Sequence, residues 1–281
     1  MNCMVRYWGV NAFGHDASLC VVENDMVIFH KLSGGEFLTE SVVDDALSFG
    51  KPDVICYYEN PLLKRTRQLY SGEWNKAFNM LTPKLHMLEF GINCPIKYVS
   101  HHRSHATASY LTSDLNDAII LVADAIGEWE TVTVWHAVGN NLTKLDSHRY
   151  PFSLGLFYTA FSKLYGVSER EFMKLSVDGY PIHYVKAKKY LDRNLHKGIK
   201  DWGDVDKNLP ASVQKVFVDA LIDIVKPFKG MSNNLLMAGG CAFNELAVKQ
   251  LNARVTISPG DSSSSIGAVA AYLNKRLKGN K

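Results

Sequence analysis

The sequence lacks the features of secreted, membrane-spanning and nucleic-acid-binding proteins. Its five cysteines are scattered without a CxxC pair, and three lie in apolar runs where a thiol packs as a small hydrophobe. No apolar run approaches the roughly 20 residues that a membrane span needs, and no basic segment precedes an apolar signal core. The net charge is only +3, which gives no reason to expect a nucleic-acid or membrane partner. We therefore expect a reduced, cytoplasmic protein.

The order of expected elements occurs twice along the chain. Residues 5–30 predict three short strands joined by a Gly-containing turn and an Asn-Asp turn, and residues 117–145 predict the same order again. A chain of 281 residues, 47% hydrophobic, is long enough for two coupled lobes. We expect a duplicated, two-lobed α/β fold with lobes at 1–115 and 116–263, and a C-terminal helix within 264–281 that returns to the first lobe.

Apolar periodicity places the remaining elements. It predicts a buried strand over 53–58 and helices over 39–49, 63–70, 74–88 with a break at Pro83, 153–165, 211–225 and 264–277. Residues 187–210 are polar and charged without a clear pattern. They predict a surface excursion or lid.

Three of the ten histidines fall within five residues, from His101 to His105. The stretch follows a strand-like run and enters an Ala-rich run, so Ser100 is the expected N-cap of a helix. On that helix His101 and His105 lie four residues apart on one face, where two imidazoles can bind one metal ion. His102 points elsewhere and is free to contact an anion at the helix N-terminus. The alternative is a surface helix that happens to be rich in histidine.

Polar turns follow the first strand of each predicted lobe. In the first, Gly14 precedes His15 and Asp16, and its missing side chain lets a phosphate or acyl group approach the backbone. The alternative is an ordinary hairpin turn. In the second, Asp124 follows an unbroken apolar strand, a position favoured for ligand contact in open sheets, and Glu128 closes the same turn. The alternative there is a solvated loop.

Two later turns have similar character. The Gly239-Gly240 pair lets the backbone close on a flat nucleoside or a phosphate, and Asn244 can hydrogen-bond a ribose or base. Asp261 lies at the mouth of the last helix. Either it or a neighbouring serine caps that helix, or its carboxylate completes a two-His, one-carboxylate metal site with the paired histidines.

These motifs resemble the N-terminal catalytic domain of the O-carbamoyltransferases of the nodulation-factor and antibiotic-tailoring type. The resemblance covers nearly the whole chain, through five motifs in order: His101-His102-x-x-His105, Asp124-x-x-Gly127-Glu128-Trp129, Ser153-Leu-Gly-Leu-Phe-Tyr, Gly239-Gly240-Cys-Ala-Phe-Asn244 and Pro259-Gly-Asp261-Ser-Ser. That family is related to the tRNA threonylcarbamoyltransferase and to the hydrogenase-maturation carbamoyltransferase. The resemblance implies an actin/hexokinase/Hsp70-type fold with ribonuclease H-like halves.

The resemblance also implies roles for the candidate residues. A divalent transition metal (iron, zinc or manganese) is expected at His101, His105 and Asp261. The resemblance places the ATP or AMP moiety of carbamoyl-adenylate at the turn of Gly239, Gly240 and Asn244, and the acyl group at the turn that carries His15 and Asp16. From their own positions in the sequence, we expect Asp124, Gly127, Glu128 and His102 to belong to the same nucleotide site. His15 is our candidate base, because an imidazole with a near-neutral pKa suits that task.

The implied reaction moves a carbamoyl group from carbamoyl-adenylate, or from carbamoyl phosphate with ATP, to a hydroxyl of a small-molecule or nucleoside acceptor. Full-length members carry a C-terminal domain that makes carbamoyl-adenylate, and this chain ends after the helix that follows Asp261. A separate carbamoyl-adenylate-forming protein is therefore an expected partner. The family's Lys-x-Met-Gly-Leu-Ala stretch appears only as Glu171-Phe-Met173-Lys174-Leu175-Ser176, so Lys174 receives no role.

Two other functions stay open. One is an ATP-dependent phosphotransferase of the same fold, against which the histidine pair argues because Mg²⁺ prefers oxygen ligands. The other is a non-catalytic nucleotide-binding subunit that regulates a partner.

Overall fold

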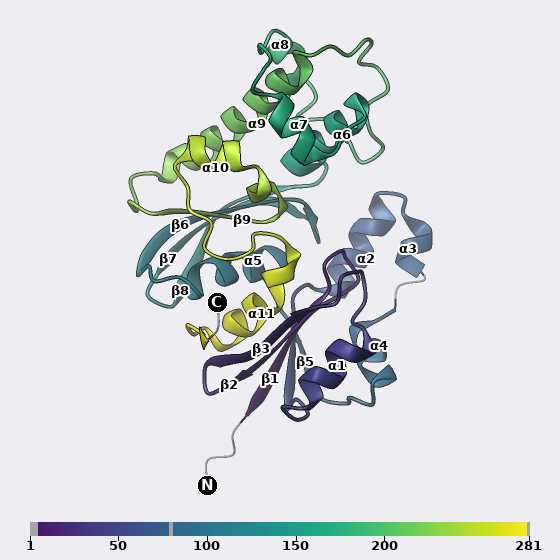
Figure 1. Ribbon diagram of the computed structural model, residues 1–281, viewed down its shortest axis with the longest axis vertical. Helices are drawn as coiled ribbons and strands as arrows, with labels where there is room; N and C mark the ends of the chain where they lie inside the picture. The colour runs from purple at the N-terminus through teal and green to yellow at the C-terminus, as the bar shows by residue number, and fades with distance from the viewer. Residues whose placement is uncertain (1–4, 79–80, 280–281) are drawn as a thin grey trace.

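Two β-sheets lie on either side of a central pair of helices, α5 (His101–Leu111) and α11 (Ser264–Leu273), as Figure 1 shows. The structure is a computed structural model that describes residues 5–78 and 81–279. Both central helices contribute buried side chains to the core that joins the two sheets. The layers therefore run from outer helices through one sheet, the central pair and the other sheet to a second set of outer helices.

The first sheet has the strand order β10-β3-β2-β1-β4-β5. Its strands are β1 (Arg6–Asn11), β2 (Ser18–Glu23), β3 (Met26–Leu32), β4 (Val54–Tyr57), β5 (Ile96–Tyr98) and β10 (Lys278–Gly279). The first three form an antiparallel meander, while β4 runs parallel to β1 and β5 parallel to β4. α1 (Glu40–Leu47) contacts β2 and β3, and α11 contacts β1.

The second sheet repeats this plan with the order β8-β7-β6-β9. Its strands are β6 (Asp117–Gly127), β7 (Glu130–Val138), β8 (Asn141–Arg149) and β9 (Leu235–Ala238). They form a second antiparallel meander, with β9 parallel to its first strand in the place that β4 takes beside β1. The duplicated fold predicted from the sequence is confirmed.

β6 contributes side chains to both cores. Its alternate residues enter the central core on one face (Ala118, Ile120, Val122) and the outer core of the second lobe on the other (Ile119, Leu121, Ala123). Because successive side chains of a strand point to opposite faces, an unbroken apolar run is what a strand covered on both faces requires. Full burial of each larger aliphatic side chain contributes about 1.5–3 kcal/mol.

The outer core is closed by helices of the second lobe. These are α6 (Leu154–Tyr165), α7 (Glu169–Leu175), α8 (Tyr184–Lys188), α9 (Leu209–Val225) and α10 (Glu245–Leu251). The prediction of a surface excursion over 187–210 is wrong in part. Tyr190, Leu195 and Trp202 are buried, and both aromatic rings pack against Phe161. The aromatic residues of this segment thus anchor it to the core.

The remaining helices belong to the first lobe: α2 (Pro61–Tyr70), α3 (Trp74–Phe78) and α4 (Pro83–Glu89). The helix predicted over 74–88 is therefore two helices, and Pro83 starts the second one, since proline is tolerated in the first turn. Residues 79–80, between them, lie outside the described part of the chain. Within 5–78 and 81–279, none of the helices has both the length and the apolar character required to cross a bilayer.

Close packing fixes the two central helices against each other. A Cβ on Gly267 of α11 would lie 1.9 Å from the backbone oxygen of Ser104 in α5. A Cβ on Gly9 of β1 would lie 2.0 Å from the backbone oxygen of Ser265 on the other side of α11. Only glycine allows this approach at either position. The N-terminal ends of α5 and α11 are thereby held next to each other, and the candidate site lies there.

Candidate metal centre and adjoining cleft

The two predicted histidine ligands converge as their spacing indicated. His101 and His105 project from the first turns of α5, and their Nε2 atoms lie 3.1 Å apart. Both side chains are buried. Ser100 takes the N-cap position, but its side chain makes no capping hydrogen bond. The helix start is therefore held by packing, and its first turn presents two ring nitrogens to one point.

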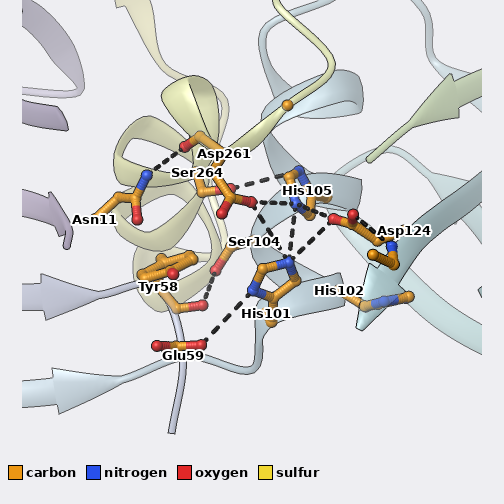
Figure 2. A network of polar contacts seen from close by, with 12 residues as sticks. Asn11, Tyr58, Glu59, His101, His102, Ser104, His105, Asp124, Asp261 and Ser264 are labelled. Atoms are coloured by element: carbon orange, nitrogen blue, oxygen red, sulfur yellow. Dashed lines mark hydrogen bonds and ion pairs between the residues drawn. The ribbon is translucent and has the colours of Figure 1, made fainter. Parts of the chain in front are cut away.

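Two carboxylates complete the cluster from separate segments (Figure 2). Asp261 Oδ1 lies 3.1 Å from His105 Nε2 and 3.5 Å from His101 Nε2, and Asp124 Oδ2 lies 3.3 Å from both nitrogens. The four ligand atoms all lie within 4.8 Å of one another. The serines and Asp261 make no side-chain cap of α11, so the capping alternative is not what the structure shows.

The protonation states of the cluster are set by ion pairing against burial. Burial would lower the pKa of His105, but Asp124 and Asp261 outweigh it and raise that pKa to about 9. Burial would likewise lower the pKa of His101, but Asp261 and Asp124 outweigh burial and raise that pKa. Burial would raise the pKa values of Asp124 and Asp261, but the imidazoles hold both below their usual range. Without a cation, protons on the rings separate the two carboxylates, and a metal ion can take their place.

His102 and Gly127 lie against the candidate metal centre. The His102 ring is 1% exposed, its Nδ1 is 3.0 Å from Thr133 Oγ1, and burial holds its pKa well below the ordinary value, so the ring is neutral. A Cβ on Gly127 would lie 2.3 Å from the His101 ring and 2.9 Å from that of His102. Gly127 thus makes room for the histidines, and the nucleotide contacts expected of both residues stay predictions.

Glu128 lies in the turn between β6 and β7, directly after Gly127, and faces the first lobe. Its buried carboxylate accepts a hydrogen bond of 2.5 Å from the backbone N–H of Asn60, and burial raises its pKa. Next to it, the Trp129 indole N–H donates to Thr66 in α2 at 3.1 Å. The turn therefore joins the second lobe to the start of α2. Its predicted contact with a nucleotide also stays a prediction.

A cleft of about 580 Å³ adjoins the metal centre. Asp124 and Gly240 belong to its lining, and a Cβ on Gly240 would lie only 3.0 Å from Asp124 Oδ1. The other walls come mainly from α6, α7 and the start of α10. A volume of this size lies in the range of small-molecule sites, about 300–1,000 Å³.

The strand-to-helix turn after β9 closes one end of the cleft. Gly239 has φ +83°, and a Cβ there would lie 2.4 Å from the backbone oxygen of Ala123, so this turn requires glycine. Asn244 lines the cleft but is already engaged: its Oδ1 accepts from the Ala247 N–H, and its amide exchanges two hydrogen bonds of 2.9 Å with Gln214. One amide hydrogen of Asn244 is left for a ligand.

His15 is the cleft residue that comes from the first lobe. Its ring is exposed, and Nδ1 lies 2.9 Å from Asp16 Oδ2. Partial desolvation lowers the pKa of His15, but Asp16 and Asp261 outweigh it and raise it above the usual value. Asn11 donates to the backbone oxygens of Asp16 at 3.0 Å and Asp261 at 2.8 Å. The turn that carries His15 is thus tied to the segment that carries a metal ligand.

The roles of several residues around this site could not be read from sequence patterns. The expected nucleotide residue Asp124 belongs to the metal cluster as well, and its place after an apolar strand signalled a ligand without saying which. Glu169 and Arg170 line the cleft from the start of α7, and no spacing pattern marked them. Lys174 is exposed, whereas Met173 beside it lines the cleft.

Comparison with known proteins agrees with the resemblance. Residues 64–180 match the family described as carbamoyltransferase N-terminus. An uncharacterized protein of Synechocystis sp. is 26% identical over 218 residues, which make up 63% of this chain and 35% of that protein. The match therefore spans about a third of the length of that relative. The family match covers His101, His105 and Asp124, while His15, Gly240 and Asp261 lie outside it.

Solved structures share the fold at low identity. Component A of (R)-2-hydroxyglutaryl-CoA dehydratase from Acidaminococcus fermentans aligns with a TM-score of 0.54 and 13% identity, over 95% of this chain and 97% of that one. The activator of 2-hydroxyisocaproyl-CoA dehydratase from Clostridium difficile, solved with ADPNP, gives 0.53 and 12%, over 96% and 94%. Full-length HypF, bound to phosphate and nucleotide, gives 0.54 and 12%, over 96% and 55%. Residues 64–180 thus match the carbamoyltransferase N-terminus family, in agreement with the resemblance, and the chain shares the fold of these solved structures.

Proposed function

We propose that this chain is a metal-dependent carbamoyltransferase that moves a carbamoyl group from carbamoyl-adenylate to a hydroxyl of a small-molecule or nucleoside acceptor. The family match supports carbamoyl transfer in general. The observation that carries the finer proposal is the convergence of two imidazoles and two carboxylates at the wall of a nucleotide-sized cleft. No single element supplies this arrangement, because its ligands come from α5, β6 and the segment before α11.

The donor set of His101, His105, Asp124 and Asp261 suits a divalent transition metal such as iron, zinc or manganese. Buried nitrogen and oxygen donors of this kind, with two negative charges among them, fit such an ion better than Mg²⁺, which prefers oxygen ligands. A metal bound there would supply a Lewis acid for phosphate or carbonyl oxygens. The donor set likewise disfavours the ATP-dependent phosphotransferase as an alternative.

The cleft is the proposed site of the adenylate. Asp124 belongs both to the cleft lining and to the cluster, so a phosphate at that end of the cleft would lie next to a metal bound by the cluster. The nucleoside would then extend along α6 and α7, where apolar side chains and the remaining Asn244 amide hydrogen are available. Binding energy from the nucleoside would align the reacting carbonyl at the metal end of the cleft.

His15 is the proposed general base. If its Nδ1–H donates to Asp16, the Nε2 lone pair is left to accept a proton, which is how a neighbouring carboxylate orients an imidazole. The acceptor oxygen then bonds to the carbamoyl carbon, the bond from that carbon to the AMP phosphate oxygen breaks, and His15 takes the hydroxyl proton. General-base catalysis of this kind contributes about 10²–10⁴-fold.

Transfer can be tested with preformed carbamoyl-adenylate and a panel of sugars and nucleosides, with the product identified by mass spectrometry. We expect transfer from carbamoyl-adenylate to at least one hydroxyl acceptor of the panel. His15→Asn should lower kcat by about 10²-fold or more. His136→Asn is the matched control, because it also removes a histidine paired with an aspartate, Asp117, on the second sheet. Efficient transfer from carbamoyl phosphate without any nucleotide would contradict the proposal.

A further inference from the structure

A buried glutamate and lysine lie behind the metal centre, on the Nδ1 side of His101 (Figure 2 shows the glutamate). Glu59 follows β4, and its carboxylate is almost completely buried. Lys64 of α2 donates to Glu59 Oε1 at 2.6 Å and to the backbone oxygen of Phe13 at 2.9 Å. Glu59 Oε2 lies 3.9 Å from His101 Nδ1. The two oxygens of Glu59 therefore face different groups.

Metal binding creates a specific need at His101. A neutral imidazole that offers Nε2 to a metal carries its proton on Nδ1, and a buried N–H needs an acceptor. His101 Nδ1 is buried and has no hydrogen-bond partner among the described residues. The corresponding atom of His105 lies 3.4 Å from Ser264 Oγ. Of the two metal-facing histidines, His101 is thus the one whose outer nitrogen lacks a hydrogen bond.

Glu59 is placed to meet that need. Within residues 5–78 and 81–279, no group donates a hydrogen bond to its Oε2, so this oxygen is available. A shift of about 1 Å or less closes the 3.9 Å separation to hydrogen-bond length. Glu59 does not line the cleft, so it has no direct contact with a substrate there. Any effect it has on the site must pass through His101.

We propose that Glu59 is a positioning residue of the metal centre, which accepts the His101 Nδ1–H bond and so keeps the Nε2 lone pair directed at the metal. Lys64 holds the other carboxylate oxygen and, through Phe13, ties this support to the turn that carries His15. The inference rests on the proposed metal centre and adds a residue that no sequence motif marked.

The test compares zinc affinity of Glu59→Gln with the wild type by competition with a chelator. Glutamine has one acceptor and one donor, whereas Lys64 and His101 both present donors, so one of the two contacts is lost. Loss of an outer partner of this kind weakens metal binding about 10- to 100-fold, and we expect a change of that size. Wild-type affinity in Glu59→Gln would overturn the inference.

Glu73→Gln is the matched control. Glu73 also pairs with cations, Arg67 at 2.5 Å and Lys76 at 3.0 Å, in a largely buried setting outside the cluster. A general loss of stability appears in both variants, but only Glu59→Gln should lose zinc affinity. Equal loss in both variants would reduce Glu59 to a structural role.

A second measurement uses the folded wild type alone and so does not depend on a variant. In the zinc-loaded protein, histidine nitrogen NMR should show His101 protonated at Nδ1, with a downfield, slowly exchanging proton. A ring protonated at Nε2, or a rapidly exchanging Nδ1 proton, would overturn the inference. Failure of the wild type to bind zinc, iron or manganese would instead contradict the proposed metal centre itself. That outcome differs from one in which the wild type and Glu59→Gln bind zinc equally tightly, which would contradict only the role of Glu59.

Discussion

The candidate metal centre assembles three buried side chains and the partly exposed Asp124, and their charges are compatible only with protons or a cation between them. Removing any one of these side chains leaves only three metal ligands. The loss of metal affinity should therefore exceed the loss of about 10- to 100-fold that is expected for an outer partner. We expect His105→Ala, Asp261→Ala and Asp124→Ala each to lose most of a stoichiometric transition metal after dialysis. Elemental analysis of the purified variants measures this directly.

His102→Ala provides the control on the same helix. Its ring is equally buried but contacts Thr133 rather than the ligand atoms. This variant should keep its metal, even if its stability falls. Comparable metal loss in His102→Ala would mean that the ligand assignment is wrong.

The histidine pair could be predicted from the sequence, because residues four apart on a helix lie on the same face. The sequence could not show which carboxylate binds the metal and which contacts a nucleotide. Asp124 and Asp261 both lie at turns. Whether Asp124 reaches the histidines depends on how β6 packs against α5, and whether Asp261 does so depends on how α11 packs against α5. Glu59 had no signal at all, since its contact to His101 joins residues that are distant in the chain.

The central helix pair is the element that sets the distance between the ligands. Gly267→Ala would place a methyl group 1.9 Å from the Ser104 carbonyl, which belongs to a helix backbone, so α5 and α11 would have to move apart. Overpacking of this kind costs about 1–3 kcal/mol, and we expect a loss at the upper end of that range. Urea unfolding should show a lower midpoint.

Gly35→Ala is the matched control, because a Cβ at Gly35 meets nothing within 4 Å. It should leave the free energy of unfolding within about 0.5 kcal/mol of the wild-type value. If Gly267→Ala proves equally neutral, α11 does not pack against α5 as closely as described. Metal content of Gly267→Ala should fall as well, since the separation of α5 and α11 would increase.

Elements with strong periodicity were predictable and an irregular one was not. The two meanders and α6, α9 and α11 follow from alternation and from 3.6-residue spacing. Residues 187–210 have no such period, yet Tyr190 and Trp202 anchor them by edge-to-face contacts with Phe161 of α6. Contacts of this kind join distant parts of the chain, and local pattern carries no information about them.

In the whole molecule, the cleft is where the two lobes contribute to one site. Most of its lining comes from the second lobe, and His15 reaches it from the first. A ligand that contacts both lobes stabilises the folded state by mass action, because it binds the native chain and not the unfolded one. Nucleotide binding should therefore appear as a rise in melting temperature.

We expect AMP or ATP at about 100 times its Kd to stabilise the protein by about 2.7 kcal/mol, a rise of roughly 5 °C for a chain of this size. Gly240→Val should abolish the rise, because its side chain fills the cleft next to Asp124. Gly230→Val is the matched control, since a Cβ there meets nothing within 4 Å, and it should keep the full rise. Metal content measured on Gly240→Val separates a blocked cleft from a displaced Asp124. The absence of any rise in the wild type at millimolar nucleotide would count against the cleft as an adenylate site, while leaving the metal centre to be judged by its own variants.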